Sequence, residues 1–502
     1  MKKKTKRILD SVHGYIDIDD SYFSNIIDTD YFQRLRRIEQ TSTRALFPCA
    51  RHDRFIHSLG VFHIGCKIVE RLSHCSNLEN VSFDLSPIFE SYKIACLLHD
   101  VCHSPFSHTF EKYFDNKKSD LKALLKKIVA SESFSKDWES VLDPSAPHER
   151  MSAIVAVMQF GRFIKETAKA DCELVARMII GLHYRDNSDE ACFRNAMIEL
   201  IHGDVIDADG LDYVCRDAWA SGYSTNKIDI TRLVASICIE KNDKGKYTLC
   251  FTTKSLNEIE SVLKVKTFQQ FYVINHHTVT YEQKLLVEAV KSTALELIGC
   301  DEELSSKDIV ERKENAIRNL CSIYAFVQPE PGIPIGVKTK KGIVISMPMD
   351  DDFVFLMKMN KEDNYVKQWL SRKYDLKPLW KSKADFYALF PNLVEVKLTA
   401  NSWIFNDDCK RYIADNFNIP IKDIWIERAT PKYKGNFAKK VNLFVGGKVI
   451  SYEKLFPKDI QSYEPPENEF FYIFVPINSK IDCILKSLKE ECSKMFFERR
   501  NG

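Results

Sequence analysis

Histidine and aspartate side chains gather within residues 51–111, so the fold must bring together polar groups that share one chemistry. They are His57, His99, Asp100, His103 and His108. Imidazole and carboxylate are ligands that borderline divalent metals prefer, and imidazole also transfers protons near neutral pH. A single histidine is commonly an ordinary hydrogen-bonded residue. The group as a whole predicts a metal centre, in which one further aspartate from a distant segment completes the ligand set.

Apolar residues at three-to-four spacing predict helices on both sides of this group. The predicted helices cover residues 22–40, 61–72, 86–98, 121–129, 171–184, 188–202, 255–275 and 282–299. The helix over 86–98 begins at Ser86-Pro87, where a capping hydroxyl precedes a proline, and it delivers the His99-Asp100 pair at its C-terminal end. Pro105 then turns the backbone, so His103 and His108 can fold back toward the same cavity.

Two more segments supply polar groups to this helical part of the chain. His148 opens an apolar helix after a proline-containing loop, and Asp209 lies in an apolar, helical stretch over residues 206–217. Residues 10–20 read as a turn-rich entry. Acidic groups in the apolar stretch are costly to bury without positive partners, which also points to a built site.

The pattern changes after about residue 320. Residues 332–347 read as a β-hairpin around the basic turn 338–342, and strand-like runs follow at 393–398, 423–427, 441–445 and 470–475. An amphipathic helix over 479–497 ends the chain. The predicted fold is mainly α, with an all-helical body and a smaller α+β C-terminal lobe. We expect a domain over 1–300 with an insertion at about 112–146, a connecting region over 301–400 and the lobe over 401–502.

Composition narrows the class of protein. The 502 residues carry a net charge of +2 with both signs interspersed, which argues against a nucleic-acid partner. The 15 cysteines are scattered and contain no C-x-x-C pair, which is typical of reduced thiols. The basic residues 1–7 are not followed by an apolar run, and no segment approaches the roughly 18 apolar residues of a membrane span. We expect a cytoplasmic protein without a membrane segment.

Four ordered strings connect these observations. They read DTDYFQRLR over 28–36, RFIHSLG over 54–60, HDVCHSPFSH over 99–108 and DGLDYVCRD over 209–217. An isolated His-Asp dipeptide would carry no information, but the four strings in order resemble the HD-domain superfamily. They are most similar to its deoxynucleoside triphosphate (dNTP) triphosphohydrolases, from about residue 10 to 300 and more weakly beyond. The resemblance implies hydrolysis of dNTPs to deoxynucleoside and tripolyphosphate, which lowers the dNTP pool and is compatible with a role in anti-phage defence.

The resemblance also implies site residues. One divalent transition metal, with Mn, Fe, Zn and Ni all open, would be held by His57, His99, Asp100 and Asp209, and Mg would accompany the phosphates. The catalytic residues would be Arg54 on the α-phosphate, His108 beside the attacking water and His148 as the general acid. The substrate-binding residues would be His103 on phosphate and Gln40, Tyr213, Asp217 and Tyr281 on the sugar. Tyr213 and Tyr281 also fit ordinary core positions, and Asp212 fits a structural partner of an arginine.

A regulatory nucleotide site is implied at Asp28, Gln33 and Arg36. On one helix, positions 28 and 36 share a face, and a carboxylate suits guanine while arginine suits phosphate. GTP, dGTP or another dNTP would then activate a homo-oligomer, either a dimer or a tetramer. The alternative interpretation of these residues is a solvated polar face with an exposed ion pair.

Three positions depart from the family pattern. Gly210 stands where a lysine often follows the metal-binding aspartate, Val273 stands in register with an arginine, and Thr41 replaces a leucine. The missing cations leave open whether a tri-, di- or monophosphate is cleaved, with Lys264, Lys266 and Lys284 as candidate replacements. Two other functions stay open: an HD phosphodiesterase or nuclease acting on cyclic or single-stranded nucleotides, and a non-catalytic nucleotide sensor.

Overall fold

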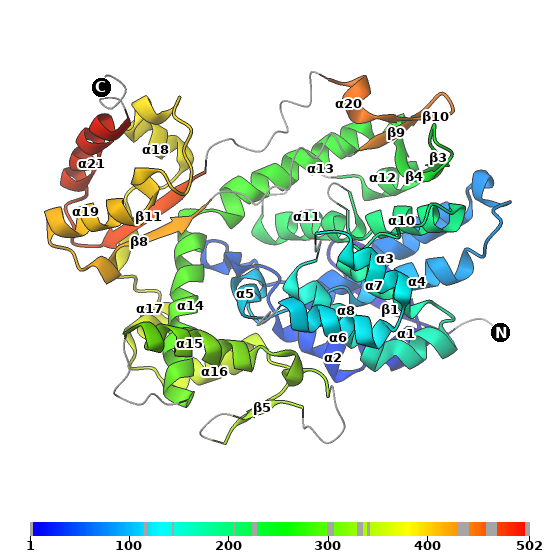
Figure 1. The fold of residues 1–502 in the computed structure, drawn as a ribbon, viewed down its shortest axis with the longest axis horizontal. Coiled ribbons are helices and arrows are strands. Elements are labelled where there is room, and N and C mark those ends of the chain that lie inside the picture. Colours follow the sequence, from blue (N-terminus) through cyan, green and yellow to red (C-terminus); the bar gives the residue numbers. More distant parts are fainter. Residues whose placement is uncertain are drawn as a thin grey trace. The chain divides into compact units, whose positions relative to one another are not determined.

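The computed structural model describes residues 4–114, 118–142, 145–203, 206–222, 228–298, 306–328, 335–338, 342–429, 441–457 and 469–496. Within these residues the chain forms two compact units (Figure 1). Unit 1 comprises Met1–Lys266, Thr293–Leu356 and Asn436–Tyr463, and unit 2 comprises Thr267–Ser292, Met357–Gly435 and Glu464–Gly502. Among the described helices, none combines the length and apolar character that crossing a membrane requires. The described cysteines are all free thiols.

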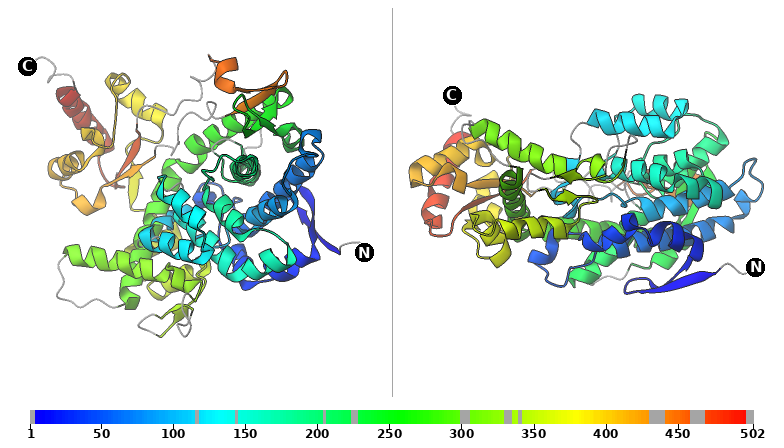
Figure 2. Two further views of the ribbon diagram at one scale, coloured as in Figure 1. Left: turned by 45° about the vertical axis from the view of Figure 1, so that its right-hand side comes forward. Right: turned by 90° about the horizontal axis from the view of Figure 1, so that it is seen from below.

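Unit 1 is mainly helical, which confirms the predicted fold class. Its helices are α1 (Asp20–Tyr22), α2 (Asp30–Gln33), α3 (Arg54–Ser73), α4 (Ser86–Leu98), α5 (Glu111–Phe114), α6 (Lys118–Val129), α7 (Glu132–Glu139), α8 (Pro147–Arg162), α9 (Cys172–Ile180), α10 (Asp189–Glu199), α11 (Ala208–Ser221), α12 (Ile230–Ser236), α15 (Ser306–Leu320) and α20 (Tyr452–Leu455). Three helices run across the boundaries of the units: α13 (Leu256–Phe268), α14 (His277–Ile298) and α16 (Asp350–Met359). Figure 2 shows the helices of unit 1 from two further sides.

The core of unit 1 is built around α3 and α4, which pack on each other and on α11 and α9 respectively. The carboxylate of Asp53 caps the start of α3 by accepting from the Ile56 N–H at 3.0 Å. Pro87 stands in the first turn of α4, where its missing N–H costs nothing. The expected Ser86 cap is not made, because Leu85 is the N-cap residue and its side chain caps nothing. The helix still ends at Leu98, immediately before His99.

Unit 1 also contains strands in an N-terminal hairpin and in a four-stranded sheet, and of these only the one over residues 442–445 matches a predicted run, that at 441–445. Strands β1 (Thr5–Asp10) and β2 (Gly14–Asp19) form an antiparallel hairpin in place of the expected turn-rich entry. A four-stranded sheet follows the order β10 (Lys448–Ser451), β9 (Asn442–Val445), β4 (Tyr247–Thr252) and β3 (Ile237–Lys241). Strands β4 and β9 pair in parallel, with Phe251 opposite Leu443. The expectation of an all-helical body is therefore wrong in detail, although helices dominate it.

The predicted hairpin over 332–347 is present as β5 (Val337–Lys338) paired with β6 (Val344–Ile345), while its turn residues 339–341 lie outside the described residues. The segment over the predicted insertion forms α5, α6 and α7. Phe134 and Trp138 of α7 are fully buried. The segment therefore contributes to the core of unit 1.

Unit 2 is a small α+β unit. Its sheet has the order β7 (Leu376–Pro378), β11 (Phe471–Pro476) and β8 (Trp425–Arg428), all antiparallel. Its helices include α17 (Asn364–Ser371), α18 (Lys383–Leu389), α19 (Asp407–Phe417) and α21 (Ile481–Phe496). An aromatic and aliphatic core, with Trp380, Phe386, Ile473 and Phe474 nearly inaccessible to solvent, holds these elements together. The last predicted helix is thus confirmed up to Phe496, and residue 497 lies outside the described residues.

Two predicted elements are wrong. The helix expected over 22–40 is broken into α1, a π-turn over Phe23–Ile27, α2 and a 3-10 turn over Arg34–Arg37. The chain breaks at Thr29, whose hydroxyl donates to the Ile26 carbonyl at 2.6 Å, and it becomes extended at Ile38. The strand expected over 393–398 is instead a 3-10 turn, Pro391–Leu393, followed by irregular chain.

The predicted domain boundaries at residues 300 and 400 stay predictions. The two compact units divide the chain at other residues. Strands β9 and β10 pair within the sheet of unit 1, and residues 267–292 belong to unit 2.

Candidate metal centre

Helices α3 and α11 and the end of α4 bring the four predicted metal ligands together inside unit 1. His57 Nε2 lies 3.0 Å from Asp209 Oδ1 and 3.6 Å from Asp100 Oδ2. His99 Nε2 lies 3.3 Å from His57 Nε2, 3.4 Å from Asp100 Oδ2 and 3.8 Å from Asp209 Oδ1. Two nitrogens and two oxygens therefore face one point, as the ligand set of a divalent ion requires.

Hydrogen bonds at the far sides of both rings fix their orientation. His57 Nδ1 lies 2.7 Å from Asp212 Oδ2, and His99 Nδ1 lies 3.0 Å from the Cys96 carbonyl oxygen. Because a carbonyl can only accept, His99 Nδ1 carries the proton, and its Nε2 keeps a free lone pair. A ring held in this way presents Nε2 to a metal in the correct tautomer.

Asp212 is the structural anchor of this arrangement. Arg216 donates to both of its oxygens, at 2.8 and 2.9 Å, and His13 Nε2 lies 2.6 Å from Oδ1. The sequence analysis assigned Asp212 to an arginine, and the structure adds that the same carboxylate orients His57. Arg216 also donates to Asp10 at 2.9 Å, so the fully buried ion pairs are mutually satisfied.

Neighbouring side chains set the pKa values of the predicted ligands. Burial disfavours a charged His57, yet hydrogen bonds to Asp209 and Asp212 raise its pKa to about 9. Burial likewise opposes ionisation of Asp100 and Asp209, but Arg54 holds the pKa of Asp100 well below its usual range, and His57 lowers that of Asp209 to about 2. Two carboxylates therefore stay ionised beside two imidazoles. This donor set fits a divalent cation, which would take the place of the proton on His57.

A second histidine cluster lies next to the ligands. The donor atoms of His103, His108 and His148 lie within 4.8 Å of one another. Glu111 bridges two of them, with one carboxylate oxygen 2.6 Å from His148 Nδ1 and the other 2.9 Å from His108 Nδ1. His148 Nε2 points toward Asp100, 3.9 Å from its Oδ1. The structure thus joins His148 to the centre despite the long segment that separates it from His108 in the sequence.

Glu111 sets the protonation of His148. Burial disfavours the imidazolium, but the hydrogen bond and the charge of Glu111 raise the pKa of His148 to about 9. The two histidines in turn hold the pKa of Glu111 far below its usual range, although burial works against this. His148 therefore carries a proton at neutral pH. Glu111 was missed in the sequence, where its position one helical turn after His108 was the available signal.

Several buried polar atoms near the centre make no hydrogen bond to any described residue. Among them are Gln40 Oε1, His52 Nδ1 and His103 Nε2. Gln40 and His103 are predicted substrate-binding residues, and His52 Nε2 lies 2.6 Å from a third one, Asp217. Buried polar groups are normally paired, so three such atoms around one site are the signature of a cavity built for a polar ligand.

The loop that carries His103 and His108 is held by residues from elsewhere in unit 1. Phe106 and Ser107 both have a left-handed backbone, with φ of 53° and 51°. The carboxylate of Asp350 accepts from the Phe106 N–H at 2.6 Å and from the Glu39 N–H at 2.9 Å. Arg34 donates to the His103 carbonyl at 2.6 Å. These bonds maintain a strained turn, as is common at functional sites.

Lys266 fills the space beside Gly210. A Cβ at position 210 would lie 2.7 Å from Lys266 Nζ and 2.8 Å from Asp207 Oδ1, so a larger residue there would require these two side chains to shift. Lys266 is buried, and its Nζ lies 5.5 Å from the centre of the Tyr213 ring. Burial lowers its pKa, but Tyr213, Asp207 and Asp209 raise it further, so the group stays charged.

The other two candidate lysines lie elsewhere. Lys264 is exposed and pairs with Glu260 at 3.5 Å. Lys284 belongs to unit 2 and pairs with Glu288 at 3.2 Å and Glu427 at 3.4 Å.

The remaining predicted residues fall into two places. Arg54 is buried at the centre, where it donates to Asp100 at 2.5 Å and to the Ser107 hydroxyl at 3.1 Å. Tyr281 lies in the core of unit 2, where its hydroxyl donates to Gln368 at 3.0 Å. Its role as a sugar contact stays a prediction.

The predicted regulatory residues do not share one helix face, because the helix over 22–40 is broken. Asp28 lies 3.5 Å from Lys6 Nζ, while Arg36 donates to Gln33 at 2.9 Å. The Arg36 guanidinium also lies 3.5 Å from the centre of the Phe55 ring. The prediction that positions 28 and 36 share one helix face is therefore wrong, although Asp28 and Arg36 are both exposed.

Comparison with known proteins agrees with this geometry. Residues 54–197 match the family model described as HD domain. The chain is 27% identical over 347 residues to the "Deoxynucleoside triphosphate triphosphohydrolase SAMHD1 homolog" of Dictyostelium discoideum, covering 65% of this chain and 60% of that protein. It is 29% identical over 301 residues to the "Deoxynucleoside triphosphate triphosphohydrolase SAMHD1" of Gallus gallus, covering 58% of this chain and 45% of that protein. The chain thus spans less than two thirds of either relative.

Solved structures share the fold. A hypothetical protein from Aquifex aeolicus superposes with a TM-score of 0.57 at 20% identity, covering 97% of this chain and 100% of that one. A phosphohydrolase from Bacteroides thetaiotaomicron gives a TM-score of 0.59 at 17% identity, covering 94% and 99%. Residues 54–197, which include His57, His99 and Asp100, thus form an HD domain. The curated relatives support an HD family like the dNTP triphosphohydrolases.

Proposed function

We propose that this protein hydrolyses dNTPs to deoxynucleoside and tripolyphosphate. The observation that carries the proposal is the position of a protonated His148, whose Nε2 lies 3.9 Å from the metal ligand Asp100. An acid at that point is within reach of the leaving oxygen of a phosphate ester bound at the centre. The curated relatives bear names with the same activity, which supports this choice of substrate.

His57, His99, Asp100 and Asp209 would hold one divalent ion. Such an ion supplies Lewis-acid charge that offsets the negative phosphate oxygens. Mn, Fe, Zn and Ni all accept this mixture of imidazole and carboxylate, and Mg would accompany the phosphates.

The side chains of this protein then have separate roles in binding and proton transfer. Arg54 offers its remaining guanidinium donors to the α-phosphate. His103 Nδ1 faces the Ser104 carbonyl at 3.3 Å, which leaves Nε2 for the substrate. Burial and the charge of Arg54 hold the pKa of His103 well below its usual range, so Nε2 donates to a phosphate only where the phosphate charge offsets both effects. Water attacks the α-phosphorus and forms a new P–O bond, and His108 accepts the water proton. The bond to the 5′-oxygen breaks, and that oxygen takes the proton of His148.

The sugar and the distal phosphates have their own contacts. Gln40 Oε1 and His52 Nδ1 are buried acceptors without a partner among the described residues, and the other nitrogen of His52 contacts Asp217. Sugar hydroxyls can donate to these acceptors. Tyr213 packs beside Lys266, which supplies the cation missing at Gly210 and favours a polyphosphate leaving group. In the cell the reaction would lower the dNTP pool, and such depletion suits defence against phage.

We also propose that the protein is a homo-oligomer, a dimer or tetramer, activated by GTP, dGTP or another dNTP. Asp28, Gln33 and Arg36 are the residues proposed to recognise the activator.

The test uses Asp100→Asn and His57→Ala with a panel of dNTPs, NTPs, cyclic dinucleotides and short oligonucleotides. Loss of one ligand removes both the metal and the charge that offsets the phosphates, so we expect metal content to fall and hydrolysis to drop at least about a thousandfold. Glu260→Gln, on the exposed face of α13, is the matched control and should retain both. Products other than tripolyphosphate, or unchanged metal and activity in both variants, would refute the function.

A further inference from the structure

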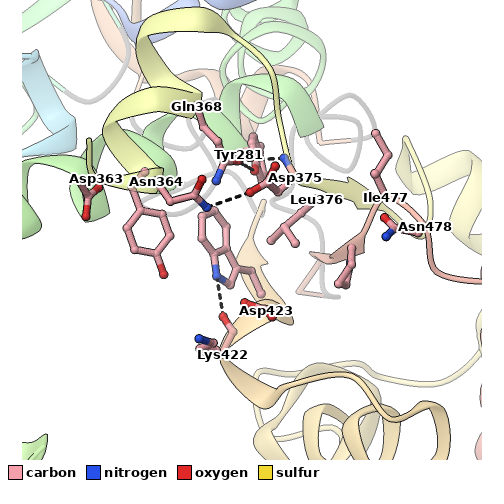
Figure 3. A pocket seen from close by; sticks show the side chains of 13 residues that line it. Tyr281, Asp363, Asn364, Gln368, Asp375, Leu376, Lys422, Asp423, Ile477 and Asn478 are labelled. Carbon is pink, nitrogen blue, oxygen red and sulfur yellow. Dashed lines mark hydrogen bonds between the residues drawn. The ribbon is translucent and has the colours of Figure 1, made fainter. Parts of the chain in front are cut away.

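Unit 2 contains a pocket of about 520 Å³ that takes no part in the metal centre. Its walls come from α17, the start of β7, the turn before β8 and the end of β11 (Figure 3). Lining residues include Asp363, Tyr365, Gln368, Asp375, Asp423 and Trp425. A volume of this size is in the usual range for small-molecule sites.

Gln368 presents an unused donor to this pocket. Its side chain is 5% exposed, and its Oε1 accepts from the Tyr281 hydroxyl at 3.0 Å and from the Asp375 N–H at 2.9 Å. A backbone N–H can only donate, so the atom facing Asp375 must be the amide oxygen and the other must be the NH₂ group. Among the described residues nothing accepts from this NH₂, which points toward the pocket in Figure 3. A buried amide donor of this kind calls for an acceptor on a ligand.

Asp423 presents the complementary group. Its carboxylate makes no hydrogen bond or ion pair with the described residues, whereas the other two carboxylates of the pocket are engaged. Asp363 accepts from the Val366 N–H at 3.1 Å, and Asp375 accepts from the Asn364 amide at 2.9 Å. Three carboxylates against the single ammonium of Lys422 make the pocket negative, so a phosphate would be repelled.

An aromatic wall joins these polar ends. Tyr365 lies 6.3 Å from Trp425 between ring centres, and Tyr281 stacks on Trp425 at 5.3 Å with 27° between the planes. The indole is fixed by its N–H, which donates to the Lys422 carbonyl at 3.2 Å. Rigid aromatic side chains favour a planar ligand.

We propose that this pocket binds the base of an unphosphorylated nucleoside that carries a ring carbonyl and N–H groups, such as deoxyguanosine or thymidine. The carbonyl accepts from the Gln368 NH₂, an N–H donates to the Asp423 carboxylate, and the ring packs on the aromatic wall. A guanidinium or ammonium group would pair with Asp423 but would leave the Gln368 donor unmet. The site does not depend on the hydrolase function proposed above.

The experiment is isothermal titration of the full chain, treated with a chelator, with deoxyguanosine, thymidine, dGMP and agmatine. Gln368→Glu keeps the oxygen that Tyr281 and Asp375 use but replaces the donor with an acceptor, and Asp423→Asn removes the charged acceptor. We expect each to weaken nucleoside binding by at least about tenfold. Asp415→Asn, exposed on α19 of the same unit and outside the pocket, is the control and should bind as the unaltered protein does.

The outcomes separate the possibilities. Nucleoside binding that weakens in Asp423→Asn but not in Asp415→Asn, with dGMP weaker than deoxyguanosine, supports the site even if Gln368→Glu fails to fold. Binding of agmatine in place of nucleosides, tighter binding of dGMP, or nucleoside binding that both variants leave unchanged would overturn it. Because the chelated protein is assayed for binding alone, failure here leaves the hydrolase proposal standing, and the reverse also holds.

Discussion

At the scale of single residues, the pair His148 and Glu111 decides whether the centre has an acid. His148 Nδ1 is 2.6 Å from Glu111, and this contact outweighs the cost of burial to raise the pKa of His148 to about 9. A general acid must be protonated to work, so in its proposed role His148 would act below that pH and would lose its proton above it. Its second nitrogen, turned toward Asp100, is the one that can reach a substrate.

We therefore expect Glu111→Gln to lower the pKa of His148, because the anion that stabilises the imidazolium is gone. The alkaline limb of the kcat profile should move to lower pH, and kcat at pH 8 should fall by about ten- to a hundredfold. Steady-state kinetics across pH 6–10 with metal analysis would measure this. Glu139→Gln, which alters only the exposed pair with Lys126, should leave the profile in place. An unchanged alkaline limb in Glu111→Gln would show that Glu111 does not control the acid.

The same scale shows what the sequence could and could not reveal. Residue types predict a metal centre near His57, His99 and Asp100, and the family resemblance implies Asp209 as the further ligand; the structure brings all four to one point. Glu111 and His52 were missed, because a carboxylate or histidine that orients another side chain has no motif of its own, and the spacing of Glu111 after His108 is only a weak signal. The role of such a side chain depends on a distance that only the folded chain supplies. For example, His52 Nε2 lies 2.6 Å from Asp217 Oδ1.

At the scale of elements, the contact between α3 and α11 positions His57. A Cβ at Gly60 of α3 would lie 1.9 Å from Asp212 Oδ1 and 2.6 Å from Arg216 Nη2, so the two helices meet at a glycine. Asp212 is the residue that orients His57 through its Nδ1. The glycine in the string RFIHSLG is thus required by packing against the carboxylate that supports a metal ligand.

Gly60→Ala should push Asp212 away from His57. We expect a loss of about 1–3 kcal/mol in the free energy of unfolding from overpacking. Metal affinity should also fall by about ten- to a hundredfold, because the outer partner of a ligand is displaced. Chemical denaturation and metal titration would measure both.

Gly161→Ala is the control, because its Cβ would meet only Cys172 Sγ at 3.8 Å. This helical position should gain up to about 1 kcal/mol. Equal behaviour of the two variants would rule out the close contact at Gly60.

Elements with strong periodicity were predictable, and those shaped by distant partners were not. Helix α4 and residues 61–72 of α3 follow from their apolar spacing, whereas the first two turns of α3, which carry Arg54 and His57, were not predicted. The segment over 22–40 has similar spacing, yet it breaks at Thr29 and becomes extended at Ile38, whose carbonyl accepts from the Arg54 N–H at 2.9 Å. The parallel pairing of Phe251 with Leu443 is likewise invisible in the sequence, since neither strand contains information about the register of the other.

At the scale of the whole molecule, the chain passes between the two units several times, and α13 and α14 each belong to both. Each unit carries a ligand site of its own: the metal centre in unit 1 and the aromatic pocket in unit 2.

The last prediction concerns activation by nucleotides. Asp28 is half exposed and pairs only loosely with Lys6, at 3.5 Å, so its carboxylate can accept from the N1–H and amine of guanine without breaking a strong contact. If GTP or dGTP binds there and favours the assembled state, activity and molecular mass should rise together, by about 5–150-fold in activity for a typical coupling free energy.

Asp28→Asn should weaken both responses while sparing the metal, whereas Asp30→Asn, exposed two residues away, should respond normally. Light scattering coupled to product assays would follow mass and rate in the same sample. Full activity in the unliganded protein, with no response to any nucleotide and none to Asp28→Asn, would mean that this surface is an ordinary polar face. Regulation of the proposed activity would then lie elsewhere or be absent.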